Sequence, residues 1–106
     1  MSNKRSSFTV LYRWRLHPGA ETSFVEAWEH LTKVLKTKGA LGARLHRGTD
    51  GLWYAYAQWP SDELRQNVFA QQIDPEATKR LSTATAECLP EVVLEIVADY
   101  LEPHNL

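Results

Sequence analysis

The residues best suited to chemistry lie in one ten-residue stretch, Leu52 to Ser61, which reads LWYAYAQWPS. Its odd-numbered positions are Trp53, Ala55, Ala57 and Trp59, and alternation with a period of two is typical of a β-strand with two different faces. One face is therefore large at both ends and small in the middle, which leaves space beside the strand. Because indole rings bury flat ring systems well, we interpret this strand as the wall of a pocket for an aromatic molecule.

Further candidate residues come from two other segments. Tyr12 and Trp14 share one face of a strand predicted over Phe8 to Leu16, and Asn67 lies in a predicted helix after the tryptophan-rich strand. Tyr12, Trp59 and Asn67 are hydrogen-bond donors that could stabilise a phenolate-like anion in a water-poor pocket. The alternative interpretation is that the aromatic side chains simply fill the core.

Other kinds of chemistry find little support in the residue pattern. Ser residues lack a nucleophile-elbow pattern, and no Gly-rich phosphate loop is present. The single Cys88 excludes an intramolecular disulfide and fits the inner stripe of a predicted helix. We therefore predict no metal site, because the four histidines show no ligand-like spacing: His17, His30, His46 and His104.

Length and composition indicate one ordinary globular domain. The chain has 106 residues, 43% hydrophobic residues and a net charge of −1, so no nucleic-acid or anionic-membrane partner is indicated. Apolar runs are too short for a membrane span, and MSNKRSS lacks the apolar segment of a secretory signal. We expect a cytoplasmic protein with a flexible lead over residues 1–7, one domain over residues 8–102 and a tail over residues 103–106.

The order of the predicted elements defines the fold class. A strand, a helix, two strands, a helix in two pieces and a last strand form two split βαβ units. We predict an α+β, ferredoxin-like βαββαβ sandwich with a four-stranded antiparallel sheet and helices on one face. The predicted elements are a strand at Phe8–Leu16, a helix from Glu21 to near Gly39, strands at Leu41–Arg47 and Leu52–Trp59, helices capped by Ser61 and Asp74 and ending near Gln72 and Cys88, and a strand at Val92–Leu101.

The second and third strands form a predicted hairpin. Gly48 to Gly51 supplies the Asp-Gly turn signal, so the two strands should be antiparallel neighbours. Arg44, His46 and Arg47 in this hairpin could form a cationic rim at a pocket mouth. The plainer alternative is a solvated hairpin surface.

The sheet face without helices is a predicted interface. Opposite charges pair well across strands, so we expect Glu95 and Asp99 to face Arg13 and Arg15 on this side of the sheet. A twofold homodimer joining two such sheets would cover the mixed apolar surface. Its other members are Leu11, Tyr54, Tyr56, Val93, Val97 and Leu101.

The segments YRWRLHPGAETSFVEAW and LGARLHRGTDGLWYAYAQWPS resemble the antibiotic biosynthesis monooxygenase superfamily of dimeric α/β-barrel proteins. The resemblance implies a ligand cavity between sheet and helices in each subunit, with Trp59 equivalent to a tryptophan of the family's third strand. It places Trp53, Ala55, Ala57, Tyr12 and Trp14 on the cavity side. It also implies a monooxygenase without metal or organic cofactor, with dioxygen as co-substrate, acting on an aromatic or polycyclic phenol or quinol-type metabolite.

The same resemblance leaves a second function open. The haem-degrading branch pairs the tryptophan with an Asn on the first strand and a His in the second helical region, and this chain has neither, which argues against haem degradation. Phenol-oxidising members carry an Asn earlier on the tryptophan strand, where this chain has Ala55 and Ala57. The alternative is a non-catalytic small-molecule-binding or stress-response barrel with the same pocket.

Overall fold

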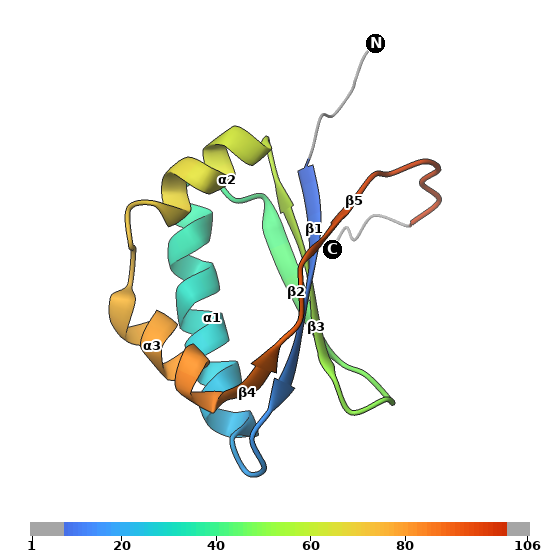
Figure 1. The fold of residues 1–106 in the computed structure, drawn as a ribbon. Helices are drawn as coiled ribbons and strands as arrows, with labels where there is room; N and C mark the ends of the chain where they lie inside the picture. The colour runs from blue at the N-terminus through green and yellow to red at the C-terminus, as the bar shows by residue number, and fades with distance from the viewer. Residues whose placement is uncertain (1–7, 102–106) are drawn as a thin grey trace.

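The computed structural model describes residues 8–101 and contains an antiparallel sheet with its helices gathered on one face (Figure 1). The sheet order is β2-β3-β1-β4, and β5 also pairs with β1. This architecture confirms the α+β, ferredoxin-like prediction, while the predicted lead over residues 1–7 and tail over 103–106 lie outside the described residues. The elements are β1 (Phe8–Leu16), α1 (Glu21–Thr37), β2 (Gly42–Arg47), β3 (Trp53–Trp59), α2 (Asp62–Phe69), α3 (Pro75–Ala84), β4 (Thr85–Cys88) and β5 (Val92–Leu94).

The two aromatic strands are neighbours in the centre of the sheet. β1 pairs with β3 from Phe8 opposite Trp59 to Trp14 opposite Trp53. Burial alternates strictly along β3, with every odd-numbered residue buried. Directly paired residues share a face of the sheet. Val10, Tyr12 and Trp14 therefore lie on the helix side together with the odd-numbered residues of β3. The predicted two-faced strand is confirmed.

The local signals at the helix ends act as predicted. Ser61 Oγ accepts a hydrogen bond of 3.1 Å from the backbone N–H of Leu64 at the start of α2. Asp74 caps α3 in the same way, with Pro75 at the first position of the helix. α1 ends just before Gly39, whose φ of +119° favours glycine. Short-range sequence chemistry therefore sets these boundaries.

The third helix, α3, is shorter than predicted: the sequence pattern indicated a helix ending near Cys88, and this prediction is wrong. α3 ends at Ala84, and Thr85–Cys88 forms β4, an edge strand paired with β1. The backbone groups of β1 find partners along this edge, and that tertiary pairing overrides the helical pattern. Cys88 lies opposite Trp14 and is exposed, so its prediction as a core residue of a helix is wrong.

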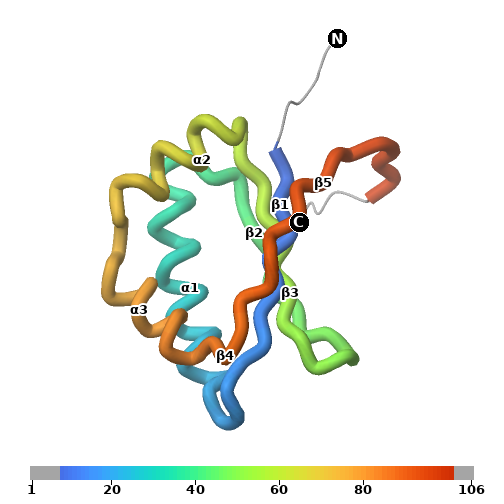
Figure 2. The backbone as a smooth tube through the Cα atoms, viewed as in Figure 1, coloured from blue at the N-terminus to red at the C-terminus, as the bar shows by residue number. Residues whose placement is uncertain are grey.

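The last strand is also much shorter than predicted. β5 covers only Val92–Leu94, and residues 95–101 leave the sheet (Figure 2). The predicted pairing of Glu95 and Asp99 with the β1 arginines is wrong, because Arg15 forms an ion pair with Glu87 and Arg13 donates to the Pro90 carbonyl at 3.0 Å.

The register of β5 also changes the predicted open face. Val92 lies opposite Leu11, whereas Val93 lies opposite the buried Val10. Val92 therefore joins the face without helices, and Val93 lies on the other face.

The main core cluster lies where α1 crosses the two aromatic strands. Phe24 packs edge-on against Trp14 and Trp53, with ring centroids 5.1 and 5.8 Å apart. Ala55 and Ala84 complete the cluster of buried residues. Trp14 and Trp53 therefore hold α1 on the sheet.

Within residues 8–101, no helix is both long and apolar enough to cross a membrane.

Candidate functional site

A small cavity lies between the sheet and α1, beside the two alanines of β3. It has a volume of about 50 Å³ and includes Tyr12, Ala55, Ala57 and Trp59 in its walls. Four of the predicted site residues thus meet at one void, because the paired strands place them on the same face. The remaining walls come from helix and edge residues, Trp28, Thr32, Leu35, Ala40, Gly42, Ala43 and Phe69.

The volume of this cavity decides what it can hold. A void of about 50 Å³ accommodates one or two water-sized molecules, whereas ligand pockets usually measure about 300 Å³ or more. Helical side chains occupy much of the space above the alanines, and the rings of Trp59 and Phe69 lie 5.7 Å apart. Phe69 is 42% exposed and Trp28 is only half-buried. Both side chains are thus less fully packed than Trp59, of which only 2% is exposed.

Three predicted site residues lie away from the cavity walls. Trp14 and Trp53 belong to the core cluster around Phe24. Asn67 is an exposed residue of α2 and does not line the cavity. The structure therefore concentrates the candidate donors at the cavity on Tyr12 and Trp59.

Arg65 is a buried polar residue that the sequence analysis missed. Only 9% of it is exposed, and it lies on α2 facing the sheet. Its Nη1 donates to the Tyr12 hydroxyl at 3.0 Å, its Nη2 donates to Glu91 at 3.1 Å, and its Nε donates to Asp62 at 3.0 Å. The signal for this placement was its position three residues before Val68, which puts both on the inner face of the helix.

The contact with Arg65 determines how Tyr12 can act. A guanidinium group has donors and no acceptor, so the Tyr12 oxygen accepts and its own proton remains available to another group. Burial raises the pKa of Tyr12, and this effect outweighs the opposing hydrogen bond from Arg65. Burial alone would lower the pKa of Arg65, but its bonds to Glu91 and Tyr12 raise it above the ordinary value. Tyr12 is therefore protonated at neutral pH, and Arg65 holds its oxygen in place.

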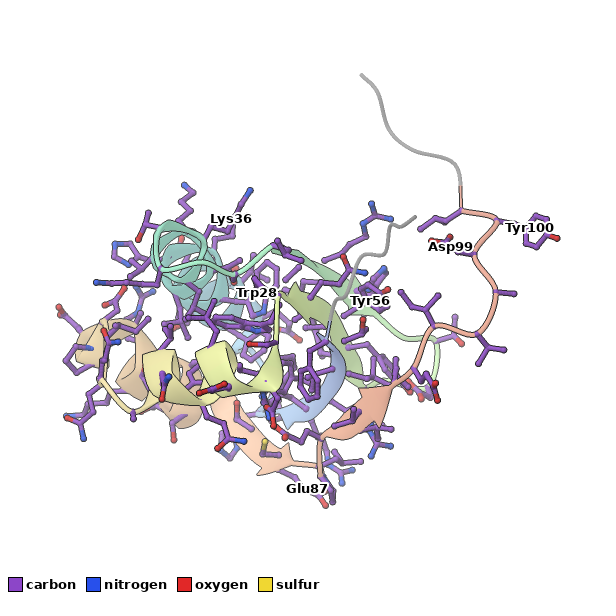
Figure 3. All side chains as sticks on the ribbon, turned by 90° about the horizontal axis from the view of Figure 1, so that it is seen from above. Trp28, Lys36, Tyr56, Glu87, Asp99 and Tyr100 are labelled. Atoms are coloured by element: carbon purple, nitrogen blue, oxygen red, sulfur yellow. The ribbon has the colours of Figure 1, made fainter. Side chains whose placement is uncertain are left out.

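A larger groove opens at the edge of the sheet, between α1 and β2. Its volume is about 570 Å³, and it shares Trp28 and Ala43 with the small cavity. Figure 3 shows Trp28 between α1 and the sheet. The other lining residues are Val25, Glu29, Arg44, Leu45, His46, Arg47 and Trp53.

The cationic residues of the hairpin divide between the two faces of the sheet. Arg44 and His46 lie opposite Tyr56 and Tyr54, whereas Arg47 lies opposite Trp53 on the helix side. Arg44 and His46 also line a hollow of about 460 Å³ on the face without helices. All three nevertheless line the groove at the edge of the sheet, Arg47 from the helix side and Arg44 and His46 from the other face. Within residues 8–101, no cluster of three or more His, Cys, Asp or Glu side chains could hold a metal ion.

Comparison with solved structures finds the same fold in several proteins. SnoaB, a cofactor-independent oxygenase from Streptomyces nogalater, superimposes with a TM-score of 0.78 at 16% identity, covering 92% of this chain and 100% of that one. Rv0793 from Mycobacterium tuberculosis gives 0.73 at 12% identity, with 91% and 100% covered. PA3566 from Pseudomonas aeruginosa gives 0.67 at 18% identity, with 92% and 100% covered. At these identities the likeness establishes the fold.

Comparison with curated proteins gives no significant match. The family assignment comes from the sequence itself, because residues 7–67 match the profile of the family described as antibiotic biosynthesis monooxygenase. The matched segment exceeds half of the 106 residues and runs from β1 into α2, so it includes Tyr12, Trp59 and Arg65. The chain belongs to the antibiotic biosynthesis monooxygenase family.

Proposed function

We propose that this protein is a monooxygenase that needs no metal or organic cofactor and oxidises an aromatic or polycyclic phenol or quinol-type metabolite. The observation that carries the proposal is Tyr12, which lines a cavity together with Trp59 and whose hydroxyl group accepts a hydrogen bond from Arg65 at 3.0 Å. The family assignment and the fold shared with SnoaB, a cofactor-independent oxygenase, support the same reaction class.

The proposed chemistry uses the substrate as its own reductant. The substrate phenol releases its proton to solvent as it binds, and hydrogen bonds from Tyr12 and the Trp59 indole N–H stabilise the resulting oxyanion in a site that excludes water. The anion then transfers an electron to dioxygen, and the two radicals combine at a ring carbon that is conjugated with the oxyanion. For a ring methylene, one oxygen atom becomes the new carbonyl group and the other leaves as water. The four electrons that reduce dioxygen all come from the substrate.

Substrate binding requires the cavity to enlarge. Its volume of about 50 Å³ is far below that of a two-ring phenol, so we propose that Trp28 and Phe69 move when the ring enters. Movement of Trp28 joins the cavity to the groove of about 570 Å³, since this side chain lines both. Asn67, on the exposed side of α2, contributes at most at the margin of the enlarged site.

Oxygen consumption tests the proposed reaction. We expect turnover with at least one member of a panel of dihydroxynaphthalenes and anthrone-like compounds. Tyr12→Phe removes one donor and keeps the ring, whereas Trp59→Phe removes the indole N–H and leaves a smaller aromatic ring; loss of one such donor lowers kcat by about 100-fold. Asn67→Ala is the matched control and should keep most of the activity. Turnover that both aromatic substitutions leave unchanged would remove Tyr12 and Trp59 from the mechanism.

A non-catalytic binding protein is the second candidate function. It is favoured by Ala55 and Ala57, which place no polar atom in the cavity wall. This candidate predicts that the same phenols bind, as measured by calorimetry, without any consumption of oxygen. Binding together with turnover would exclude it.

We also propose a homodimer formed through the sheet face without helices. Leu11, Tyr54 and Tyr56 are partly exposed on this face, although they lie in the centre of the sheet. The segment after β5 adds exposed apolar side chains, with Val97 89% and Tyr100 94% exposed. Figure 3 shows Tyr100 standing away from the sheet. A second copy of the chain would bury both surfaces.

A further inference from the structure

The groove between α1 and β2 combines aromatic walls with a cation. Trp53 forms part of its base, and Trp28 and Leu45 are partly exposed along its sides. The guanidinium carbon of Arg47 lies 4.9 Å from the centre of the Trp53 ring. This stacking follows from the strand pairing, because Arg47 is directly opposite Trp53 on the helix side of the sheet. Flat apolar surface and a planar cation thus lie next to each other.

The cation in this groove has unused hydrogen-bonding capacity. Among residues 8–101, no carboxylate lies within 4.0 Å of Arg47, whereas Arg15, Arg65 and Arg80 all form ion pairs. The contact with Trp53 is a cation–π interaction and not a hydrogen bond, so it leaves the guanidinium N–H groups available. Those groups match a carboxylate in a two-point hydrogen-bonded arrangement.

The charges around the groove also favour an anion. Glu29 is the one carboxylate among the lining residues, and it is outnumbered by Arg44 and Arg47. The groove therefore carries one net positive charge when His46 is neutral. Its volume of about 570 Å³ falls in the range of small-molecule sites, about 300–1,000 Å³.

We propose that this groove binds a planar aromatic carboxylate. The ring system lies against Trp28 and Leu45, and the carboxylate accepts two hydrogen bonds from Arg47. Neither Tyr12 nor Trp59 lines the groove, so this binding does not depend on the proposed oxygenation. Because Trp28 also borders the small cavity, a bound acid would lie next to the proposed reaction site.

Calorimetric titration with 2-naphthoate and 2-naphthamide tests the proposal. The two compounds share a ring system and differ in charge, so we expect the acid to bind more tightly to the unaltered protein. Arg47→Gln should weaken 2-naphthoate binding about tenfold, the usual effect of losing one charge-assisted contact. The same substitution should leave the affinity for 2-naphthamide within about twofold.

Lys33→Gln is the matched control, because it removes one positive charge from an exposed position of α1 outside the groove. It should leave the affinity for 2-naphthoate nearly unchanged. Absence of 2-naphthoate binding at millimolar concentration, equal affinity for acid and amide, or equal losses in the Arg47 and Lys33 variants would each overturn the proposal.

The same variants separate this inference from the proposed function. Tyr12→Phe and Trp59→Phe should leave 2-naphthoate binding intact, because both residues lie outside the groove. Binding that depends on Arg47 without any oxygen consumption would support the groove and contradict the oxygenase. Oxygen consumption together with 2-naphthoate binding that is insensitive to Arg47→Gln would do the reverse.

Discussion

At the residue scale, Arg65 links the structure of the protein to its proposed chemistry. Its side chain is 11% exposed and joins α2 to Tyr12 of β1 and to Glu91, which precedes β5. A buried guanidinium is costly unless its donors are paired. The paired network around Arg65 has two effects. It stabilises the contact between α2 and the sheet, and it leaves the Tyr12 proton free for a ligand.

Removing the Arg65 guanidinium should therefore destabilise the fold measurably. We expect Arg65→Met to lower the free energy of unfolding by about 2 kcal/mol, since it leaves partners of a buried network unpaired. Arg80→Met is the control, because its ion pair with Glu26 is exposed on both sides and should contribute less than about 1 kcal/mol. Urea denaturation measures both. Equal losses in the two variants would show that the Arg65 network has no special role.

At the element scale, Asp74 connects α3 to α1. Its Oδ1 caps α3, and its Oδ2 lies 2.5 Å from His30 Nδ1 on α1. The hydrogen bond with His30 holds the pKa of Asp74 below its usual value. One carboxylate thus begins a helix and contacts its neighbour.

The lowered pKa of Asp74 predicts a loss of stability in acid. A carboxyl group with a lower pKa in the folded protein contributes fully above its unfolded pKa, about 3.9, and that contribution disappears as the pH falls through the folded pKa. The urea midpoint should therefore fall more steeply below about pH 4 for the unaltered protein than for Asp74→Asn. Asn preserves the helix cap, so the comparison isolates the charge. Parallel acid profiles would contradict this assignment.

The edge strand β4 makes a prediction about the single thiol. In a core helix Cys88 would be shielded, but in β4 it is exposed. We expect a thiol reagent such as 5,5′-dithiobis(2-nitrobenzoate) to label one group per native chain at a rate within about tenfold of the denatured chain, because access limits thiol reactivity. Slow labelling that requires denaturant would contradict the exposed placement.

At the scale of the whole molecule, the unequal sheet faces predict association. Helices cover one face (Figure 1). The other face carries the partly exposed Leu11 and Tyr56. Light scattering should give about twice the 12.1 kDa chain mass. A buried carboxylate is strongly unfavourable in an interface, so Leu11→Glu should shift the protein to the monomer mass while circular dichroism remains unchanged.

The control for this experiment is Val34→Glu, which places the same charge on a half-buried position of α1 away from that face. It should remain dimeric. A monomeric unaltered protein, or a Leu11→Glu variant with the mass of the unaltered protein, would contradict association through the sheet.

What the sequence determined by itself was the part of the fold specified by near neighbours. The alternation in β3, the Gly48–Gly51 turn and the caps at Ser61 and Asp74 depend on residues only a few positions apart. Tertiary structure decided the rest. β4 exists because β1 offers an edge, the cavity is small because helical side chains fill the space beside Ala55 and Ala57, and Arg65 is buried because Tyr12 and Glu91 receive its hydrogen bonds. These outcomes depend on contacts between distant segments, whose energies override local preference.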